Sequence, residues 1–482
     1  MIQSLHSLHS DRKQKILVTG ATGYVGSRLV PRLSAAGHQV RCMVRTPEKV
    51  TGYGWPGVEI FKGDVLDAES LFPAMKGIDI AYYLIHAMGH SGDFEQQDAR
   101  SARNFARAAL AARIKRIIYL GGLGNPEHEL SDHLRSRQQV GKILSETGIP
   151  VTELRASIII GAGSASFEII RDLVSKLPVM ITPRWVKSLC QPIAIDDVLH
   201  YLMEVLKHSD TQGQIYDIGG AEAISYAAMM KRVAIVMGKS LHIWHVPVLT
   251  PHLSAYWLNL VTTVPMSLAF PLVEGLRNDT ICRDHRIKEV IPFTLISFEQ
   301  SVRDAMEQDQ NSNLESRWTI ADFSEPLHSA ASKRSLLTDS QKITTPIPVD
   351  KIFNKIQIIG GDTGWYYANW AWKLRGLVDR LIGGVGMRRG RRHPSDVRVG
   401  DPIDFWRVEN YIPNQHLKLK AEMKLPGAAW LEFKVEKINT VQTLFEQTAT
   451  FQPSNWYGYL YWYLLAPVHF FIFRKMAKRI AS

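Results

Sequence analysis

Cysteine is scarce in this chain: three occur among 482 residues, at Cys42, Cys190 and Cys282. They lie far apart in the sequence and show none of the paired spacings of a zinc site or a disulfide framework. This scarcity favours a protein of a reducing compartment and predicts no metal centre.

Long uninterrupted apolar runs are also missing. Residues 1–15 lack the apolar stretch of a secretory signal peptide. Segments 253–273 and 457–473 come nearest to a membrane span, but prolines and polar residues interrupt both. A spanning helix needs about 20 apolar residues. We therefore expect a cytoplasmic protein, with peripheral contact at the inner face of the membrane as the alternative.

Positive charge is unevenly distributed. Residues 346–482 contain 20 lysines and arginines against 11 aspartates and glutamates, a net charge of +9 out of +11 for the whole chain. The densest point is the run from Arg388 to His393. Such a run is either a solvated loop or a contact for anionic lipid head groups or an acidic ligand. No recognised nucleic-acid motif accompanies it, so we expect no nucleic-acid partner. The sequence indicates no oligomeric state.

A glycine-rich turn stands out near the start of the chain. It follows the apolar run 16–18 and precedes the helical pattern 27–36. A strand, a tight turn and a helix N-terminus present main-chain N–H groups to a dinucleotide pyrophosphate. The spacing predicts a cofactor turn made of Thr19, Gly20, Thr22, Gly23, Tyr24, Val25 and Gly26.

Short β-rich runs alternate with helical patterns through residues 14–160. Helices between successive strands imply right-handed crossovers. We therefore predict an α/β domain over 1–307, with a Rossmann-type doubly wound parallel sheet and substrate-side elements in 161–307. The expected strands are Lys15–Thr19, Gln39–Val44, Val58–Lys62, Ile78–Tyr83, Arg116–Leu120 and Val151–Leu154.

The pattern changes after this domain. Residues 308–345 are rich in Gln, Asn, Ser and Thr, which predicts a linker. Residues 346–482 then indicate an α+β domain, with a helix over 348–359, four strands of period-two alternation and a long apolar helix over 457–478. A helix across the buried face of an antiparallel sheet often encloses a cavity. Such a cavity would suit a small apolar ligand.

Residues 14–306 resemble the atypical and extended short-chain dehydrogenase/reductases, especially the NmrA-like and complex I accessory-subunit-like branches. The matching pieces are the turn Thr19–Gly26, Gly63-Asp64-Val65, Leu84-Ile85-His86, Leu154-Arg155-Ala156-Ser157 and Pro192–Val198. Residues 346–482 resemble a domain of unknown function often fused behind such reductases. The order of its elements is similar to that of helix-grip (START-like) domains. Its matching pieces are the segments 364–370, 404–408 and 423–427.

The cofactor choice follows from one residue. An acidic residue at the end of the second strand would bind the ribose hydroxyl of NAD, but this chain has Arg45 there. A guanidinium suits the 2′-phosphate of NADP, so we expect NADP, with NAD as the alternative. The resemblance further implies that Asp64 and Val65 lie near the adenine. It also implies that Leu84, Ile85 and His86 lie along the ribose and pyrophosphate.

The reaction chemistry is less regular. Reductases of this class commonly use Ser, Tyr and Lys, but the fifth strand here ends in Gly121-Gly122. Counting along the next helix puts His133 at the Tyr position and Arg137 at the Lys position. His133 is then a general acid and Arg137 a cationic ribose clamp. Alternatively, both only hold the cofactor or cap the helix, or a quinone or enone accepts hydride while water supplies the proton.

Two functions follow from these residues. The first is an NAD(P)H-dependent oxidoreductase that acts on an apolar carbonyl or quinone-like compound. The second is a non-catalytic NAD(P)H-binding redox sensor or assembly factor.

Overall fold

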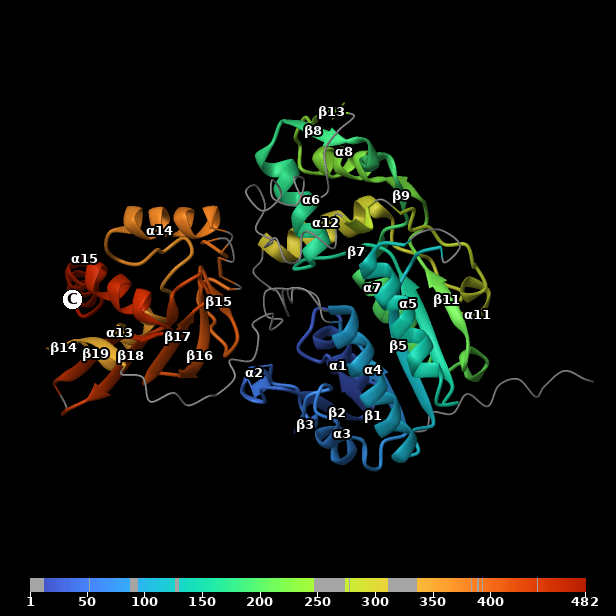
Figure 1. Cartoon of the computed structure of the whole chain (residues 1–482), viewed down its shortest axis with the longest axis horizontal. Coiled ribbons are helices and arrows are strands. Elements are labelled where there is room, and N and C mark those ends of the chain that lie inside the picture. The colour runs from blue at the N-terminus through green and yellow to red at the C-terminus, as the bar shows by residue number, and fades with distance from the viewer. Residues whose placement is uncertain are drawn as a thin grey trace, which may run out of the picture. The chain divides into compact units, whose positions relative to one another are not determined.

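The computed structural model describes residues 13–51, 53–86, 94–125, 130–246, 274–276, 278–310, 336–382, 384–387, 390–391, 393–439 and 441–482. The described residues divide into two compact units, 13–310 and 336–482. Figure 1 colours them from blue to yellow and from orange to red. Segment 253–273 lies outside the described residues, as do Arg388, Arg389 and Arg392 of the basic run.

The N-terminal unit is built on a seven-stranded parallel sheet in the order β11-β6-β5-β4-β1-β2-β3 (Figure 1). Its strands alternate between two cores: Ile16 and Val18 of β1 point into one, and Leu17 points into the other. This is why their sequences are apolar at nearly every position. The strands are β1 (Lys15–Thr19), β2 (Gln39–Val44), β3 (Glu59–Lys62), β4 (Ile80–Tyr83), β5 (Arg116–Gly122), β6 (Val151–Ala156) and β11 (Ile215–Ile218).

Helices cover both faces of this sheet, which confirms the doubly wound prediction. Helices α1 (Gly26–Ala35) and α7 (Ile195–Glu204) pack on one face. Helices α3 (Ala68–Met75), α4 (Phe94–Ala111) and α5 (Asp132–Ser145) pack on the other. The short helix α2 (Glu48–Thr51) follows β2. Because β1, β4 and β5 run parallel, their carboxyl ends lie at one edge of the sheet, where ligands of doubly wound folds bind.

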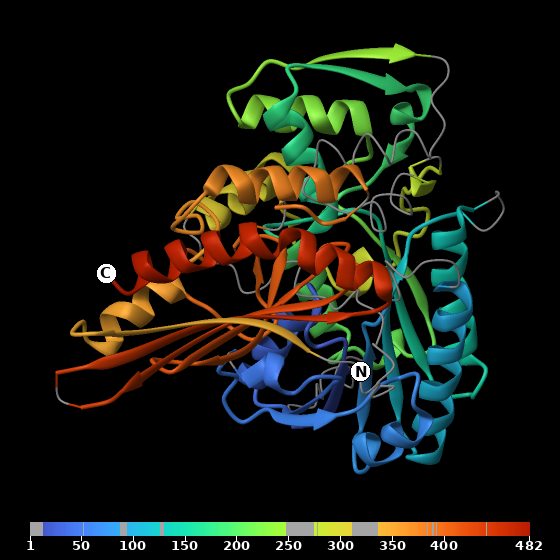
Figure 2. The same cartoon turned by 60° about the vertical axis from the view of Figure 1, so that its left-hand side comes forward.

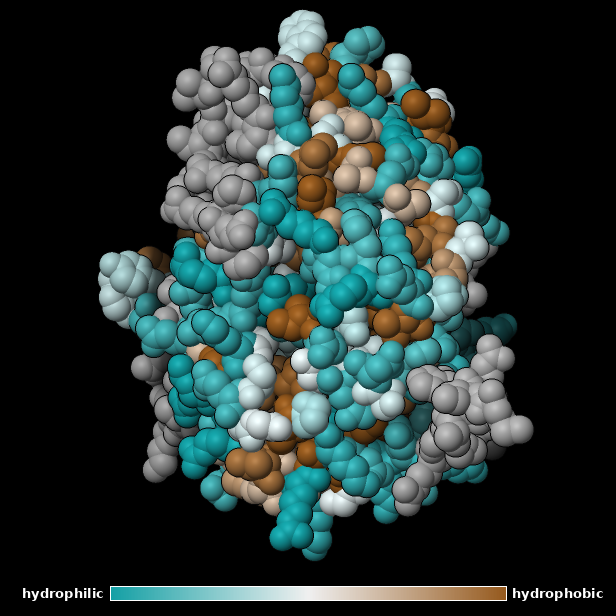
Figure 3. All heavy atoms as spheres, turned by 90° about the vertical axis from the view of Figure 1, so that its right-hand side faces the viewer, coloured by the Kyte–Doolittle hydropathy of each residue, from teal (hydrophilic) through white to brown (hydrophobic). Residues whose placement is uncertain are grey.

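The rest of the N-terminal unit consists of shorter elements outside the seven-stranded sheet. Three two-stranded sheets pair β7 with β10, β9 with β12 and β8 with β13. The strands are β7 (Ile159–Ile160), β8 (Val179–Pro183), β9 (Leu189–Cys190), β10 (Ile193–Ala194), β12 (Ile224–Ser225) and β13 (His242–Val246). The helices are α6 (Ala165–Lys176), α8 (Tyr226–Val236), α11 (Ile287–Val290) and α12 (Phe298–Gln310), with 3-10 turns at Arg184–Lys187 and Ser209–Thr211. On the side of the molecule drawn in Figure 3, hydrophobic residues occur in small groups among hydrophilic ones.

The C-terminal unit is a six-stranded antiparallel sheet in the order β14-β19-β18-β17-β16-β15. A long helix, α15 (Trp456–Ile480), lies across it, as Figure 2 shows in red. The antiparallel sheet and its closing helix confirm the predicted fold class. The other elements are β14 (Leu337–Thr345), α13 (Val349–Gln357), α14 (Asn369–Leu381), β15 (Pro402–Ile403), β16 (Trp406–Ile412), β17 (His416–Ala421), β18 (Gly427–Lys437) and β19 (Thr443–Pro453).

The predicted linker over 308–345 is wrong at both ends. Helix α12 continues to Gln310, and Leu337–Thr345 forms β14, which pairs along its whole length with β19. β14 is an edge strand whose side chains alternate between partly buried and exposed. Its sequence is therefore polar and resembles a linker in composition.

The aromatic residues near α14 divide between core and surface. Trp365 is fully buried, and Trp372 packs beside it with ring centroids 5.0 Å apart. Trp370, by contrast, is 72% exposed. Among the described residues, no helix is long and apolar enough to cross a bilayer.

Candidate functional site

The glycine turn connects β1 directly to α1. Gly20 has φ +73°, and a Cβ on it would lie 2.5 Å from the carbonyl oxygen of Leu84. A Cβ on Gly26 would lie 2.2 Å from the carbonyl oxygen of Gly20, so the helix can approach the turn only without a side chain there. A Cβ on Gly23 would meet only the Gly20 oxygen, at 3.1 Å. The other side of Gly23 is therefore open to a ligand.

The beginning of α1 fits a bound anion. Its N-cap residue Val25 supplies no side-chain hydrogen bond, and its first turn holds no acidic residue. The helix dipole and the first N–H groups therefore favour a phosphate at this position. The buried Thr19 hydroxyl donates to the Tyr82 carbonyl at 2.8 Å and ties β1 to β4. Thr22 is partly exposed, and the Tyr24 ring packs under the Arg28 guanidinium.

The residues predicted to recognise the adenosine half follow β2 and β3. Arg45 follows the last residue of β2, and its side chain is exposed. After β3, the Asp64 carboxylate accepts from the main-chain N–H of Leu66 at 3.0 Å, which shapes the turn. Val65 is buried in the core below it. Arg45 and Asp64 thus both lie at the carboxyl edge of the parallel sheet, beside the glycine turn.

The residues predicted as catalytic meet the residues predicted along the ribose and pyrophosphate at the ends of β4 and β5. Leu84, Ile85 and His86 follow β4, while His133 and Arg137 lie one turn apart on α5. The His86 and His133 rings have centroids 4.8 Å apart. The Arg137 guanidinium donates to the carbonyls of Ile85, at 3.3 Å, and Leu120. The structure therefore brings together residues that lie far apart in the sequence.

A residue missed by the sequence analysis anchors this cluster. The Asp98 carboxylate on α4 is almost fully buried and contacts the His86 Nδ1 at 3.0 Å. It also accepts from the Ser136 hydroxyl of α5 at 2.9 Å. Helical spacing places Asp98 on the same buried stripe as Ala102 and Phe105. An acidic residue on an otherwise apolar stripe is the signal that could have identified it.

Burial determines the charge of the two imidazoles. Removal from water lowers the pKa of His86 below its ordinary 6.5, and this effect outweighs the Asp98 carboxylate. The pKa of His133 is lowered well below that value, first by burial and then by His86 and Arg137. Both rings are therefore neutral near pH 7. The His86 Nε2 is buried and has no hydrogen-bond partner among the described residues, so it can accept a proton or a hydrogen bond from a ligand or from the neighbouring ring.

Comparison with known protein families finds two matches. Residues 20–169, which include the glycine turn from Gly20 onward, match the NAD(P)H-binding family. Residues 331–476 match a family described as a protein of unknown function, DUF2867. The first match lies within the N-terminal unit, and the second covers most of the C-terminal unit.

The curated relatives of the N-terminal unit include a reductase and an assembly factor. A (4-alkanoyl-5-oxo-2,5-dihydrofuran-3-yl)methyl phosphate reductase from Streptomyces griseus is 29% identical over 234 residues, 47% of this chain and 75% of the relative. The photosystem II assembly factor Ycf39 from Cyanophora paradoxa is 23% identical over 48% of this chain and 72% of the relative. Among solved structures, the Citrobacter sp. triphenylmethane reductase complexed with NADP(H) has a TM-score of 0.51 at 19% identity, covering 60% of this chain and 99% of that one. This last likeness concerns the fold.

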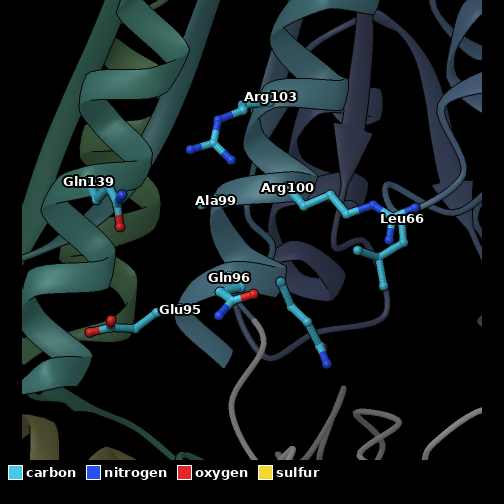
Figure 4. Close-up of a pocket in the computed structure, with 8 residues that line it drawn as sticks. Leu66, Glu95, Gln96, Ala99, Arg100, Arg103 and Gln139 are labelled. Carbon is cyan, nitrogen blue, oxygen red and sulfur yellow. The ribbon is translucent and has the colours of Figure 1, made fainter. Parts of the chain in front are cut away.

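A separate hollow lies on the outer side of α4. Its volume is about 590 Å³. Figure 4 shows Arg103 projecting from α4 toward α5, and Arg100 extending toward Leu66. None of the residues that line this hollow is among the predicted cofactor-binding or catalytic residues. The lining residues are Leu66, Glu95, Gln96, Gln97, Ala99, Arg100, Arg103 and Gln139.

Proposed function

We propose that this protein is an NADPH-dependent reductase that acts on an apolar carbonyl or quinone-like compound. The observation that carries the proposal is the meeting of three features at one sheet edge. The first is the glycine turn before α1, whose N-cap side chain makes no hydrogen bond. The others are the pair of neutral histidines at the end of β4 and on α5, and the buried Asp98 that contacts His86. Reductases among the relatives of the NAD(P)H-binding domain support the same class of reaction.

The histidine pair supplies the proton chemistry in this proposal. The cofactor, when bound, supplies a hydride for the substrate carbon. The neutral His133 ring donates a hydrogen bond and then its N–H proton to the substrate oxygen, while its other ring nitrogen takes up a proton from water and hydroxide leaves to solvent, so that a carbonyl becomes an alcohol. His86, oriented through its Nδ1 by Asp98, packs against the His133 ring and holds it in place. Arg137 holds the ends of β4 and β5 together through their carbonyls.

NADPH rather than NADH is proposed because Arg45 is exposed at the end of β2. A guanidinium paired with a phosphate forms charge-assisted hydrogen bonds of about 1.5–3 kcal/mol. Removal of Arg45 should therefore weaken NADPH binding by about ten- to a hundredfold and leave NADH binding unchanged.

A fluorescence titration with NADPH and NADH tests this choice, with R45A compared to the wild type. R107A is the matched control, because Arg107 is an exposed arginine on α4. Binding of NADPH and NADH with equal affinity by the wild type, or equal losses in R45A and R107A, would contradict the assignment.

Turnover is tested by NADPH oxidation with a panel of apolar carbonyls and quinones. H133A should lower the rate by about a hundredfold where proton donation limits it. H285A serves as control, since His285 is exposed beside α11. No NADPH consumption with any compound would reject the reductase.

A second candidate is a non-catalytic NADPH sensor or assembly factor. It is favoured by the Ycf39 relatives and by the role of Arg137, whose guanidinium is bound to two main-chain carbonyls. It predicts NADPH binding without turnover. It also predicts a protein partner whose capture depends on the NADPH/NADP ratio.

A further inference from the structure

Helix α14 turns its apolar stripe outward. Its buried face consists of Trp372, Gly376 and Asp379. Its apolar residues at helical spacing are instead 47–72% exposed. These are Trp370, Leu374, Leu377, Val378 and Leu381, together with Ile382 just after the helix.

Helix α15 has the same arrangement on a larger scale. Phe473, Met476 and Ile480 pack into the core of the C-terminal unit. The opposite face is apolar through the first four turns of the helix and strongly exposed, up to 74% at Leu464. Its principal residues are Trp456, Leu460, Tyr463, Leu464, Val468 and Phe471.

The two helices lie next to each other, as Figures 1 and 2 both show. Side chains join them: the Trp372 and Phe473 rings are 6.1 Å apart, and the Arg375 guanidinium lies 5.2 Å from the Tyr461 ring. We call the two outward faces together the α14–α15 surface. A soluble monomer rarely exposes so many neighbouring apolar side chains unless they bind something.

Charge indicates what the α14–α15 surface binds. All four charged residues of α15 are basic: Arg474, Lys475, Lys478 and Arg479. They are exposed on the last turns, next to the apolar stretch. The sole acidic residue of the two helices, Asp379 of α14, is 2% exposed. Exposed charge on these helices is therefore entirely positive.

We propose that the α14–α15 surface docks on an anionic lipid bilayer. Both helices lie in the interface, with leucine, valine and phenylalanine side chains among the acyl chains. Trp370, Trp456 and Tyr463 are the residue types that concentrate at the head-group level. The lysines and arginines of α15 extend to the lipid phosphates, which their long stems allow. This docking does not depend on the basic run Arg388–Arg392, which the sequence suggested as a lipid contact. Within that run, Arg391 donates to the carbonyls of Gln357 and Ile359.

A protein partner with an acidic groove is the competing occupant. Trp and Tyr beside a wholly basic charge set favour the bilayer. A second copy of this chain is disfavoured, because it would bring the basic ends of two α15 helices together or leave them unpaired.

Co-sedimentation of the full chain with lipid vesicles tests the proposal. One set of vesicles is phosphatidylcholine alone, and the other includes phosphatidylglycerol. We expect binding to the anionic vesicles and a loss of binding as salt is added, since salt screens the attraction. K475Q/K478Q should weaken this binding by about tenfold or more. W370Q/L464Q should weaken it comparably and remove the apolar contribution.

Matched controls separate the surface from general effects. K231Q/K288Q removes two exposed lysines of the N-terminal unit, and I235Q changes an apolar residue that is 74% exposed on α8. Neither control should change vesicle binding. Because every changed side chain is exposed, thermal unfolding should stay near that of the wild type. No binding to anionic vesicles at low salt would overturn the proposal. A lipid-free oligomer that W370Q/L464Q dissociates, without vesicle binding, would assign the surface to a second copy instead.

Discussion

Substitution of Gly26 by alanine would test the glycine turn most directly. The added Cβ would lie 2.2 Å from the Gly20 carbonyl oxygen and 2.9 Å from the Ala21 Cα, well inside normal contact distances. Both neighbours are main-chain atoms, so no side chain can rotate away and the turn itself must move. Overpacking of this kind costs about 1–3 kcal/mol of unfolding free energy. The displaced N–H groups should also lower NADPH affinity, by about tenfold or more.

Gly23 provides the matched comparison within the same turn. A Cβ there meets only one atom, the Gly20 oxygen at 3.1 Å. The free energy of unfolding of G23A should therefore stay within about 1 kcal/mol of the wild-type value. It should still weaken NADPH binding, because the methyl group occupies the side from which the pyrophosphate approaches. Urea unfolding and a fluorescence titration measure the two effects separately. If G26A had the unfolding free energy and the NADPH affinity of the wild type, the tight packing of the helix against the turn would be refuted.

Two further predictions concern buried polar side chains. Burial, with a smaller effect of Arg375, lowers the pKa of His469 from 6.5 to about 4. As the pH falls below 6.5, His469 therefore takes up a proton in the unfolded chain but not in the folded chain. This lowers the free energy of unfolding by about 3 kcal/mol between pH 7 and pH 4. H469L should remove this part of the pH dependence of urea unfolding, and an unchanged slope would contradict it. D98N should lower the reductase rate by at least about tenfold, because His86 loses the carboxylate that orients it. S136A, which removes one hydrogen bond from the same carboxylate, should cost only about 1 kcal/mol of stability and little activity.

The parallel sheet could be predicted from sequence because its strands are buried on both faces. Runs such as Ile16-Leu17-Val18 are apolar throughout, and the glycine turn follows at once. Strand β14 could not be predicted in this way. It lies at the edge of the sheet, has few apolar side chains and takes its conformation from pairing with β19.

The candidate site was likewise only partly visible in the sequence. Counting along one helix singled out His133 and Arg137, but their position near the end of β4 comes from the structure. The role of Asp98 depends on contacts with His86 from one element and Ser136 from another. Such contacts between separate elements have no local sequence pattern beyond a buried acidic residue.

The pairing of β14 with β19 has a consequence for how the C-terminal unit folds during synthesis. Leu337 pairs with Phe451, about a hundred residues later in the chain, whereas β16, β17 and β18 pair with their neighbours in sequence. The local hairpins can form while the ribosome is still adding residues, but β14 must wait for its partner. Until β19 and α15 emerge, the sheet keeps an open edge and an uncovered apolar face. An unpaired strand edge and exposed apolar surface are the features that make a partly folded chain prone to aggregation during that interval.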